Sequence, residues 1–215
     1  MHGVLEIMAG LRERQKSERY SRILDVARRR FDEHGYSDVS LESIAEDAGV
    51  SVVTVYNYYG SKAGLLLALV KESDFLLIRQ LKAMIADAPQ DMREGVAQFG
   101  QIMRRHVVKY LTRPTWRQIL AASVIEGSTS FGQDYLKLDE VLISTMEEMV
   151  SLYKSRGTLV SKVESRNLAD TLFSLQNMRF FQFVADDAMS EQEIDGKFRA
   201  DLEAFFESRL TLRSV

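Results

Sequence analysis

Apolar residues recur at intervals of three or four along almost the whole chain, which is the spacing of one face of an α-helix. Ile23, Ala27 and Phe31 illustrate this spacing, and Gly35 follows them as a helix stop. No segment keeps the strict alternation of a half-buried strand. Because the 215 residues include only two prolines, few positions interrupt a helix. We therefore expect an all-α fold.

Serine and glycine residues indicate where several of these helices begin and end. Ser40 and Ser51 can cap two short helices, over 41–48 and 51–59, which are joined by a turn at Gly49. Ser61 can cap a longer helix that ends near Pro89. Further helices are expected over 96–110, from Pro114 onward, and over 135–153, 164–186 and 190–212.

The composition excludes several classes of protein. Without cysteine, the chain has no disulfide scaffold, no thiol nucleophile and no cysteine-ligated metal. The apolar run 63–70 is much shorter than the roughly 18 residues that a membrane span needs. Basic residues follow the first apolar patch instead of preceding it, which is contrary to the order in an export signal. We expect a cytoplasmic protein with no membrane partner.

Catalytic motifs are missing from the sequence. It contains no G-x-S-x-G elbow, no H-E-x-x-H zinc motif and no G-x-G-x-x-G loop. His2, His34 and His106 are scattered, and adjacent acids such as Glu147 and Glu148 point apart on a helix. We predict no catalytic residue, no metal site and no cofactor.

Charge is distributed unevenly along the chain. The formal net charge is −3, yet residues 10–30 carry eight basic and three acidic side chains, and residues 49–62 carry no acidic one. A charge run of this kind is more often a solvated helix face than a phosphate-binding surface. Charge by itself therefore does not identify a nucleic-acid partner.

The segment 41–62 has a more specific pattern. Two short helices joined by a glycine-containing turn form a helix-turn-helix, whose second helix can enter the major groove of DNA. Its small core can be formed by Ile44, Ala45, Ala48, Val50 and Val55. The other sides of the second helix are uncharged and partly aromatic, which is unusual for a solvated helix. A helical hairpin buried in an all-α core is the alternative. The candidate DNA-binding residues are Val52, Val53, Thr54, Tyr56, Tyr58 and Lys62.

Several short motifs occur together between residues 20 and 69. They are Ala27 and Phe31 before Gly35, Ser40 before Ile44-Ala45, Ala48-Gly49-Val50-Ser51, Thr54-Val55-Tyr56-Asn57-Tyr58-Tyr59, and Ser61-Lys62 before Leu65. In this combination the region resembles the TetR family of bacterial transcriptional regulators. The resemblance implies an all-helical homodimeric repressor with an N-terminal DNA-binding domain and a C-terminal domain that dimerises and holds a small-molecule inducer. It adds Ser40 and Ser51 as supporting phosphate contacts, whereas Val53, Gly60 and Gly64 depart from the family's usual residues.

The expected domain organisation follows from this resemblance. Residues 1–16 are expected to form a flexible basic N-terminal arm, and residues 17–62 a three-helix DNA-binding domain. A larger helical domain for regulation and dimerisation occupies 63–215, and its first helix, 63–88, connects the two domains.

The last two expected helices are more apolar than one face of a surface helix requires. A second subunit can cover the additional face, and a fully internal helix pair is the alternative. With the resemblance, we predict a homodimer. The candidate interface residues are Leu172, Leu175, Phe180, Phe181, Phe198, Leu202 and Phe205.

The middle helices, which converge in the family's fold, offer a mostly apolar lining with a few polar groups, as small-ligand sites do. The alternative for each residue is that it only fills the core. We hypothesise a pocket for a small, largely apolar or aromatic inducer. The candidate lining residues are Phe99, Met103, His106, Trp116, Leu120, Met146, Met149, Phe173 and Asn177.

These predictions together describe a ligand-responsive DNA-binding transcriptional regulator. We expect a repressor that binds a near-palindromic operator in double-stranded DNA as a dimer and is released by a small molecule. An all-α enzyme, or a helical scaffold protein that retains the fold without regulating DNA, is the alternative.

Overall fold

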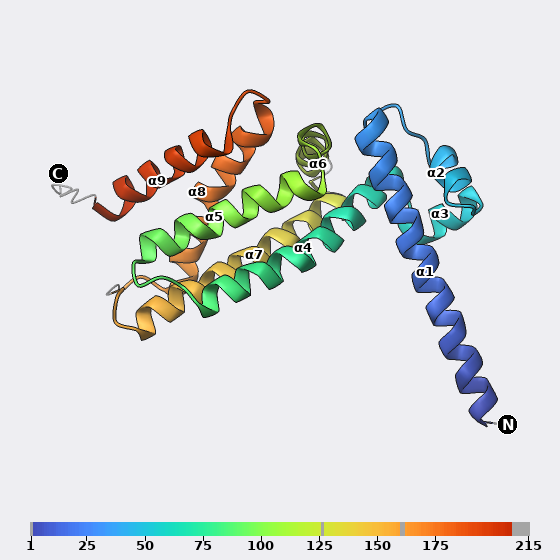
Figure 1. The fold of residues 1–215 in the computed structure, drawn as a ribbon, viewed down its shortest axis with the longest axis horizontal. Helices are drawn as coiled ribbons and strands as arrows, with labels where there is room; N and C mark the ends of the chain where they lie inside the picture. The colour runs from blue at the N-terminus through green and yellow to red at the C-terminus, as the bar shows by residue number, and fades with distance from the viewer. Residues whose placement is uncertain (1, 126, 160–161, 208–215) are drawn as a thin grey trace. The chain divides into compact units, whose positions relative to one another are not determined.

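The computed structural model describes residues 2–125, 127–159 and 162–207. Every regular element within these residues is a helix, which confirms the expected all-α fold. The end expected for the last helix near Leu212 lies outside the described residues. In chain order the helices are α1 His2–His34, α2 Leu41–Asp47, α3 Val52–Tyr59, α4 Lys62–Ala86, α5 Met92–Tyr110, α6 Arg113–Ile125, α7 Ser130–Ser155, α8 Ser165–Ala185 and α9 Glu191–Glu207 (Figure 1).

The helices pack as two units. One unit comprises Met1–Glu72 and Pro114–Gly132, and the other comprises Ser73–Arg113 and Gln133–Val215. The division therefore falls inside α4 and not at residue 62, where the DNA-binding domain was expected to end. Its physical reason is that Leu65, Leu66 and Leu69, in the first turns of α4, are buried in the core of the first unit.

Helix α1 is continuous from His2 to His34. Residues 2–16, which were expected as a flexible arm, are the first turns of this helix. The stretch is rich in leucine, methionine, glutamate, arginine and other good helix formers, and it contains no proline. Among the α1 side chains that the structure describes, burial begins at Ile23, which is fully buried.

The core of the first unit is built mainly from α1, α2, α3 and the beginning of α4. Arg30 Nε donates to Asp47 Oδ2 at 2.6 Å and ties α1 to α2. Arg28 Nη2 donates to Glu72 Oε2 at 2.6 Å and ties α1 to α4. The buried apolar side chains of this core include Ile23, Leu24, Ala27, Phe31, Ile44, Ala45, Val55, Leu65, Leu66 and Leu69.

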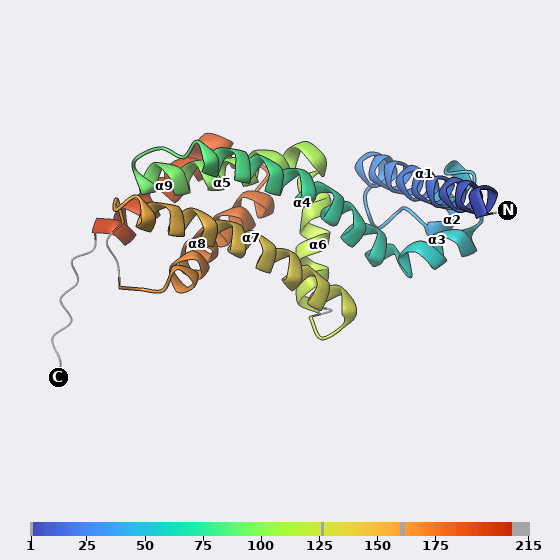
Figure 2. The ribbon, with the colours of Figure 1, turned by 90° about the horizontal axis from the view of Figure 1, so that it is seen from below.

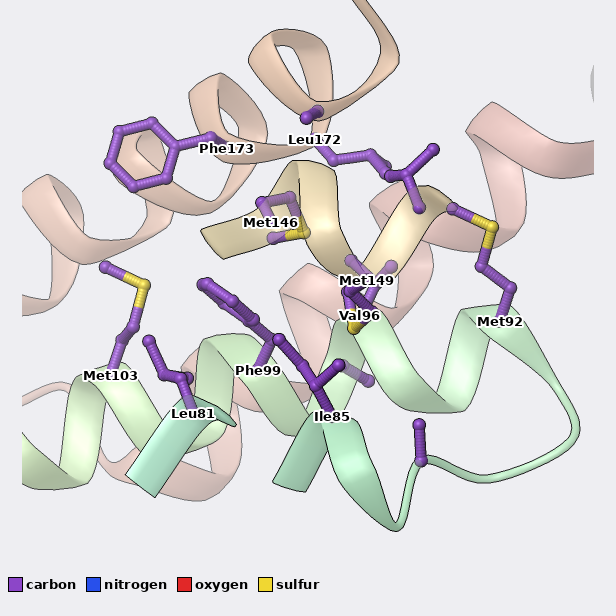
Figure 3. Close-up of a cluster of buried hydrophobic side chains, with 14 of the residues drawn as sticks. Leu81, Ile85, Met92, Val96, Phe99, Met103, Met146, Met149, Leu172 and Phe173 are labelled. Carbon is purple, nitrogen blue, oxygen red and sulfur yellow. The ribbon is translucent and has the colours of Figure 1, made fainter. Parts of the chain in front are cut away.

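The second unit has a continuous apolar core between α4, α5, α7, α8 and α9. Helix α9 lies beside α5 and α8 in both views (Figure 1, Figure 2). Met146 and Met149 of α7 occupy the middle of the cluster, between Phe99 and Ile85 on one side and Leu172 on the other (Figure 3).

A buried polar network joins three helices of this second unit. Arg104 of α5 is 1% exposed, and its Nε donates to Asp195 Oδ1 of α9 at 2.8 Å. The same guanidinium donates to Gln176 of α8. A Cβ at Gly100 would lie 2.5 Å from Gln176 Oε1 and 2.7 Å from Phe198, so only glycine allows this close approach. Because a buried cation needs its partners, the network holds α8 and α9 in one register on α5.

Candidate nucleic-acid interface

The two short helices begin at the caps that the sequence predicts. Ser40 Oγ accepts from Ser43 N at 3.1 Å at the start of α2, and Ser51 Oγ accepts from Thr54 N at 3.2 Å at the start of α3. The turn between the helices passes through Gly49 with φ of 63°, a conformation in which glycine carries no steric penalty. Both serine hydroxyls are therefore engaged in capping, on side chains that remain exposed.

Val55 orients the second short helix. It is fully buried, and Ile44, Ala45 and Ala48 are at most 3% exposed, so these side chains form the expected inner contact of α2 and α3. Val50, in the turn, is half-buried. With Val55 turned inward, the opposite face of α3 is turned toward solvent.

The outward face of α3 carries no charge. Val53 is 62% exposed and Tyr56 is 49% exposed, which is unusual for large apolar or aromatic side chains on a free helix surface. Val52 and Thr54 are half-buried, and Thr54 Oγ1 lies 2.9 Å from Ser51 Oγ. Asn57, which was not among the predicted contacts, is also exposed on this helix. The sequence signal that could have identified Asn57 as a contact was its position directly after Tyr56.

A cluster of three tyrosines holds the C-terminal end of α3 against α1. Tyr59 Oη donates to the carbonyl of Tyr20 at 2.8 Å, and the two ring centroids are 4.9 Å apart. Burial raises the pKa of Tyr59 above its usual value. The ring of Tyr58, a predicted DNA contact, is half-buried and meets Tyr20 edge-on at 6.1 Å. Tyr58 thus presents only part of its side chain to a partner.

Lys62, at the start of α4, already has partners within the first unit. Its ammonium donates to the carbonyl of Ser37 at 3.2 Å and lies 4.3 Å from the centroid of the Tyr36 ring. Partial burial lowers the pKa of the Lys62 ammonium. Since an ammonium has three N–H groups and one donates to Ser37, two others are available to a phosphate.

The unusual glycines at the α3–α4 junction have a steric explanation. Gly60 has φ of 72°, and a Cβ at Gly64 would lie 1.9 Å from the carbonyl oxygen of Tyr59. Ser61 Oγ accepts from Gly64 N at 2.9 Å and caps α4 as expected. The junction is therefore a tight turn that a side chain at either glycine would disturb.

The candidate dimer residues are in different environments. Phe181 of α8 is 53% exposed, and Leu175 and Phe205 are half-buried. Phe180 is 5% exposed and packs inward. Leu172, Phe198 and Leu202 belong to the core of the single chain. The helix pair thus has one apolar face for this core and one outer face. The outer face of α8 carries Phe181 and Met178. Met178 was not among the predicted interface residues.

The candidate ligand-binding residues do not form one group. Phe99, Met103, Met146, Met149 and Phe173 pack together in the core of the second unit. His106 is also buried, and Asn177 is half-buried. Trp116 and Leu120 lie on α6, in the first unit. The open hollows of about 270 and 370 Å³ in the second unit are lined by other residues, among them Asp91, Arg93 and Arg199.

Several polar groups are buried near the middle of α4, and of these only His106 was among the predicted site residues. His106 Nε2 lies 2.9 Å from the carbonyl of Ser73 and 2.8 Å from its hydroxyl, whereas His106 Nδ1 is buried without a hydrogen-bond partner. Burial, and secondly the charge of Asp139, raise the pKa of Asp74 to about 7. Burial raises the pKa of Asp139 to about 6. Ser73-Asp74 within an apolar helix was the available clue.

Neither a membrane-spanning helix nor a metal-binding cluster occurs in the part of the chain that the structure describes. Among residues 2–125, 127–159 and 162–207, no helix is long and apolar enough to cross a membrane. In the same part of the chain, no group of three or more histidine, aspartate or glutamate side chains could hold a metal ion.

Two capped helices that cross at a glycine turn, with the outer face of the second one free, define a helix-turn-helix DNA-binding protein. Residues 23–69 match the family model of bacterial regulatory proteins, tetR family. The helix-turn-helix segment of this chain is therefore similar to that of the TetR family of transcriptional regulators.

Similarity to known proteins extends beyond the helix-turn-helix. The transcriptional regulator EthR of Mycolicibacterium smegmatis is 22% identical over 174 residues, which cover 79% of this chain and 76% of that protein. Thermus thermophilus FadR, a repressor solved in complex with lauroyl-CoA, has a TM-score of 0.65 at 17% identity, with 91% of this chain and 97% of that chain covered. A transcriptional regulator from Saccharomonospora viridis, solved in complex with choline, has a TM-score of 0.64 at 21% identity over 92% of this chain and 100% of that chain.

Proposed function

We propose that this regulator is a dimeric repressor that binds a near-palindromic operator through α3 and leaves it when a small ligand binds in the second unit. Such a protein acts where the DNA is, in the cytoplasm, and its action requires no catalysis. The observation that supports DNA binding best is the uncharged outer face of α3, where Val53 and Tyr56 are exposed while Val55 anchors the helix from behind.

The chemistry of this face suits a major groove. The methyl groups of Val52 and Val53 can pack on thymine methyls, and the hydroxyl of Tyr56 can donate to a phosphate oxygen. The second and third N–H groups of Lys62 add a charge at the edge of the same surface. Valines at positions 52 and 53 thus read bases, whereas Tyr56 and Lys62 position the helix.

Lys62→Met is expected to weaken binding to operator and random duplexes by a similar factor. Methionine keeps an aliphatic stem over Tyr36 but removes the charge. The loss of each lysine that contacts a phosphate lowers the salt slope by about one unit. Val53→Thr is expected to change base preference and leave the salt slope unchanged. Binding is measured by fluorescence anisotropy from low to high salt, on duplexes selected from a random pool by the parental protein.

Two results would contradict this assignment. An unchanged salt slope in Lys62→Met would remove the lysine from the phosphate interface. If the parental protein selected no duplex at all, the proposed regulatory function itself would be wrong.

Dimerisation is proposed from the outer face of α8. Met178 and Phe181 are 58% and 53% exposed and are three residues apart, so they lie on one side of the helix. A two-fold dimer places two copies of α3 in successive major grooves, with half-sites about 34–36 Å apart. The operator is therefore expected to be nearly palindromic.

His106 restricts the chemistry of the proposed ligand. A carbonyl can only accept, so the contact of His106 Nε2 with the carbonyl of Ser73 assigns the proton to Nε2. Burial lowers the pKa of His106, which favours this neutral form. Nδ1 is then a buried acceptor without a partner. A ligand that meets it must supply a hydrogen-bond donor.

We propose an apolar ligand with one such donor group. The methionine-rich core beside α5 and α7 can adapt to an irregular apolar body, since methionine side chains are flexible. The carboxyl groups of buried Asp74 and half-buried Asp139 supply further acceptor oxygens in the second unit. Two proteins of the same fold were solved in complex with very different molecules, lauroyl-CoA and choline, which supports a ligand-binding role for this protein as well.

Ligands of this kind are expected to stabilise the parental protein and to weaken its binding to operator. Helix α4 carries both Lys62 of the DNA surface and Ser73, which holds His106, so it can transmit the change. A tenfold loss of operator affinity requires about 1.4 kcal/mol of coupling. Small apolar alcohols, amides and amines are screened by thermal shift and then by anisotropy.

The matched variants are His106→Phe, which keeps the stacking on Tyr110 but removes the acceptor, and Lys109→Ala, an exposed change on the same helix. His106→Phe should reduce both effects of a hit compound, and Lys109→Ala should retain them. Equal responses in the two variants would exclude His106 from the ligand site.

A further inference from the structure

The N-terminal part of α1 is a charged helix whose contact with the rest of its unit is made through Tyr20. Between residues 10 and 22, every residue whose side chain the structure describes is exposed. We call these residues the α1 extension. Burial begins at Ile23 and continues with Leu24, so the change from exposed to buried side chains occurs within one residue. Figure 1 shows α2 and α3 beside the C-terminal half of α1, with the helix continuing beyond them toward the N-terminus.

The α1 extension contains three basic side chains without an acidic partner. Lys16, Arg19 and Arg22 make no ion pair with any carboxylate in the described part of the chain, although Glu18 and Asp25 are near in sequence. By contrast, Arg28, Arg29 and Arg30 all pair with Asp25, Asp47 or Glu72 and serve the internal structure of the unit. The basic side chains without an ion-pair partner in this region therefore lie in the α1 extension.

The helical register places much of this charge on the side of α1 that faces the helix-turn-helix. Lys16, Arg19 and Ile23 are spaced by three and four residues, so they lie in one row along the helix. Ile23 at the end of this row is buried in the core of the first unit. The row of Lys16 and Arg19 continues that inner face past the point where packing ends.

The position of the extension relative to α3 is determined by Tyr20. The ring of Tyr20 contacts Tyr58 and Tyr59, and Tyr59 Oη donates to the Tyr20 carbonyl at 2.8 Å. The C-terminal end of α3 is thus attached to α1 inside the extension. At about 1.5 Å per residue, the helix continues about 15 Å beyond this point to Gly10. This length is greater than the width of a major groove, which is about 12 Å.

We propose that the α1 extension is a second DNA-binding element, which contacts the phosphate backbone of the duplex that flanks the half-site. This inference rests on the proposed function, because α3 must be in a major groove for the extension to meet DNA. The partner is duplex DNA and not an acidic protein, because Tyr20 holds this part of α1 against the end of the recognition helix α3 and the charge of the row complements phosphates. Such contacts carry no base specificity. They lengthen the footprint and increase the salt dependence of binding.

The test is a triple variant, Lys16→Gln, Arg19→Gln and Arg22→Gln. Glutamine has nearly the helix propensity of lysine and arginine, so α1 is expected to stay folded. Six contacts are lost from a dimer, which lowers the salt slope by about five units if all of them meet phosphates. We expect at least a tenfold loss of affinity for a long duplex, and no loss for a short duplex that ends at the half-sites.

A second triple variant controls for net charge. Lys109→Gln, Lys137→Gln and Lys197→Gln remove the same charge from exposed positions in the second unit. This protein should keep the parental salt slope and the parental gain from flanking DNA. Circular dichroism and melting temperature verify that both triple variants are folded.

The outcomes separate this inference from the proposed function. Hydroxyl-radical protection outside the half-sites, present in the parent and lost only in the α1 triple variant, would support the inference. If that variant kept the parental slope and footprint while Lys62→Met and Val53→Thr behaved as expected, the inference would be wrong and the proposed function would stand. The row would then be free to meet an acidic protein surface. If the parental protein bound no selected duplex, both would be overturned.

Discussion

Phe181→Asp is expected to convert the dimer into monomers and to lower operator affinity by about 100-fold or more, because two linked recognition helices bind far more tightly than one. Phe181 is 53% exposed on α8, so the substitution leaves the core of the chain intact. In a dimer interface the new carboxylate would lose its hydration without a partner, which is strongly unfavourable. Sedimentation velocity measures the oligomeric state, and anisotropy with a selected duplex measures binding.

The controls for this prediction use the contrast between an outer and an inner position. Ser151→Asp adds the same charge at an exposed site of α7 and should change neither property. Phe198→Asp should instead unfold the second unit, because Phe198 is fully buried and packs beneath Arg104. Removal of a buried phenylalanine costs about 3–5 kcal/mol, before the cost of the buried charge. A monomeric Phe181→Asp protein with parental operator affinity would refute the proposed dimer.

Asp74→Asn is expected to stabilise the protein at neutral pH and above. The pKa of Asp74 is raised to about 7, first by burial and then by the charge of Asp139. Between the unfolded-state pKa near 4 and this folded-state value, the folded chain retains a proton that the unfolded chain has released. The contribution of Asp74 to stability therefore decreases as pH rises through this range, and the penalty is complete above about pH 7.

The size of the effect follows from the same shift. A rise from 3.8 to about 7 corresponds to roughly 4 kcal/mol at most. Urea unfolding from pH 4 to 8.5 should show equal stabilities of parent and variant at the acid end and a growing advantage for Asp74→Asn toward pH 8. A difference between parent and Asp74→Asn that does not change with pH would contradict this prediction.

In Asp139→Asn, the pH-dependent decrease in stability should move to lower pH. Loss of the Asp139 charge removes a cause that raises the pKa of Asp74, so Asp74 releases its proton at a lower pH and burial alone opposes its ionisation. Parental and Asp139→Asn curves that coincide would show that the two carboxyl groups do not interact.

The helix-turn-helix could be predicted from the sequence because its determinants are local. Ser40 and Ser51 cap helices through N–H groups three residues away, and Gly49 turns the chain within one residue. The inward position of Val55 follows from helical spacing as well. These contacts need no knowledge of distant parts of the chain, so they are encoded in a short segment.

The predictions for the second unit were less specific, because apolar spacing shows that a side chain is covered but not what covers it. Phe180 and Phe181 are neighbours with nearly the same chemistry, yet one is 5% exposed and the other 53% exposed. Leu172 and Phe198 were predicted to meet a second subunit and lie in the core of their own chain. Only the packing of α8 and α9 on α5 separates these cases.

The sequence by itself determined the helical class, the caps, the turn and the inward side of α3, since each depends on residues within a few positions of one another. Only the tertiary structure decided that Lys62 meets Ser37, that Tyr59 holds Tyr20, and that His106 Nδ1 is buried without a partner. Lys62 and Ser37 are 25 positions apart, and Tyr59 and Tyr20 are 39 positions apart. His106 is 33 positions from Ser73, its hydrogen-bond partner. Their physical reason is that burial and pairing depend on which helices pack together, and helix packing is a property of the whole folded chain.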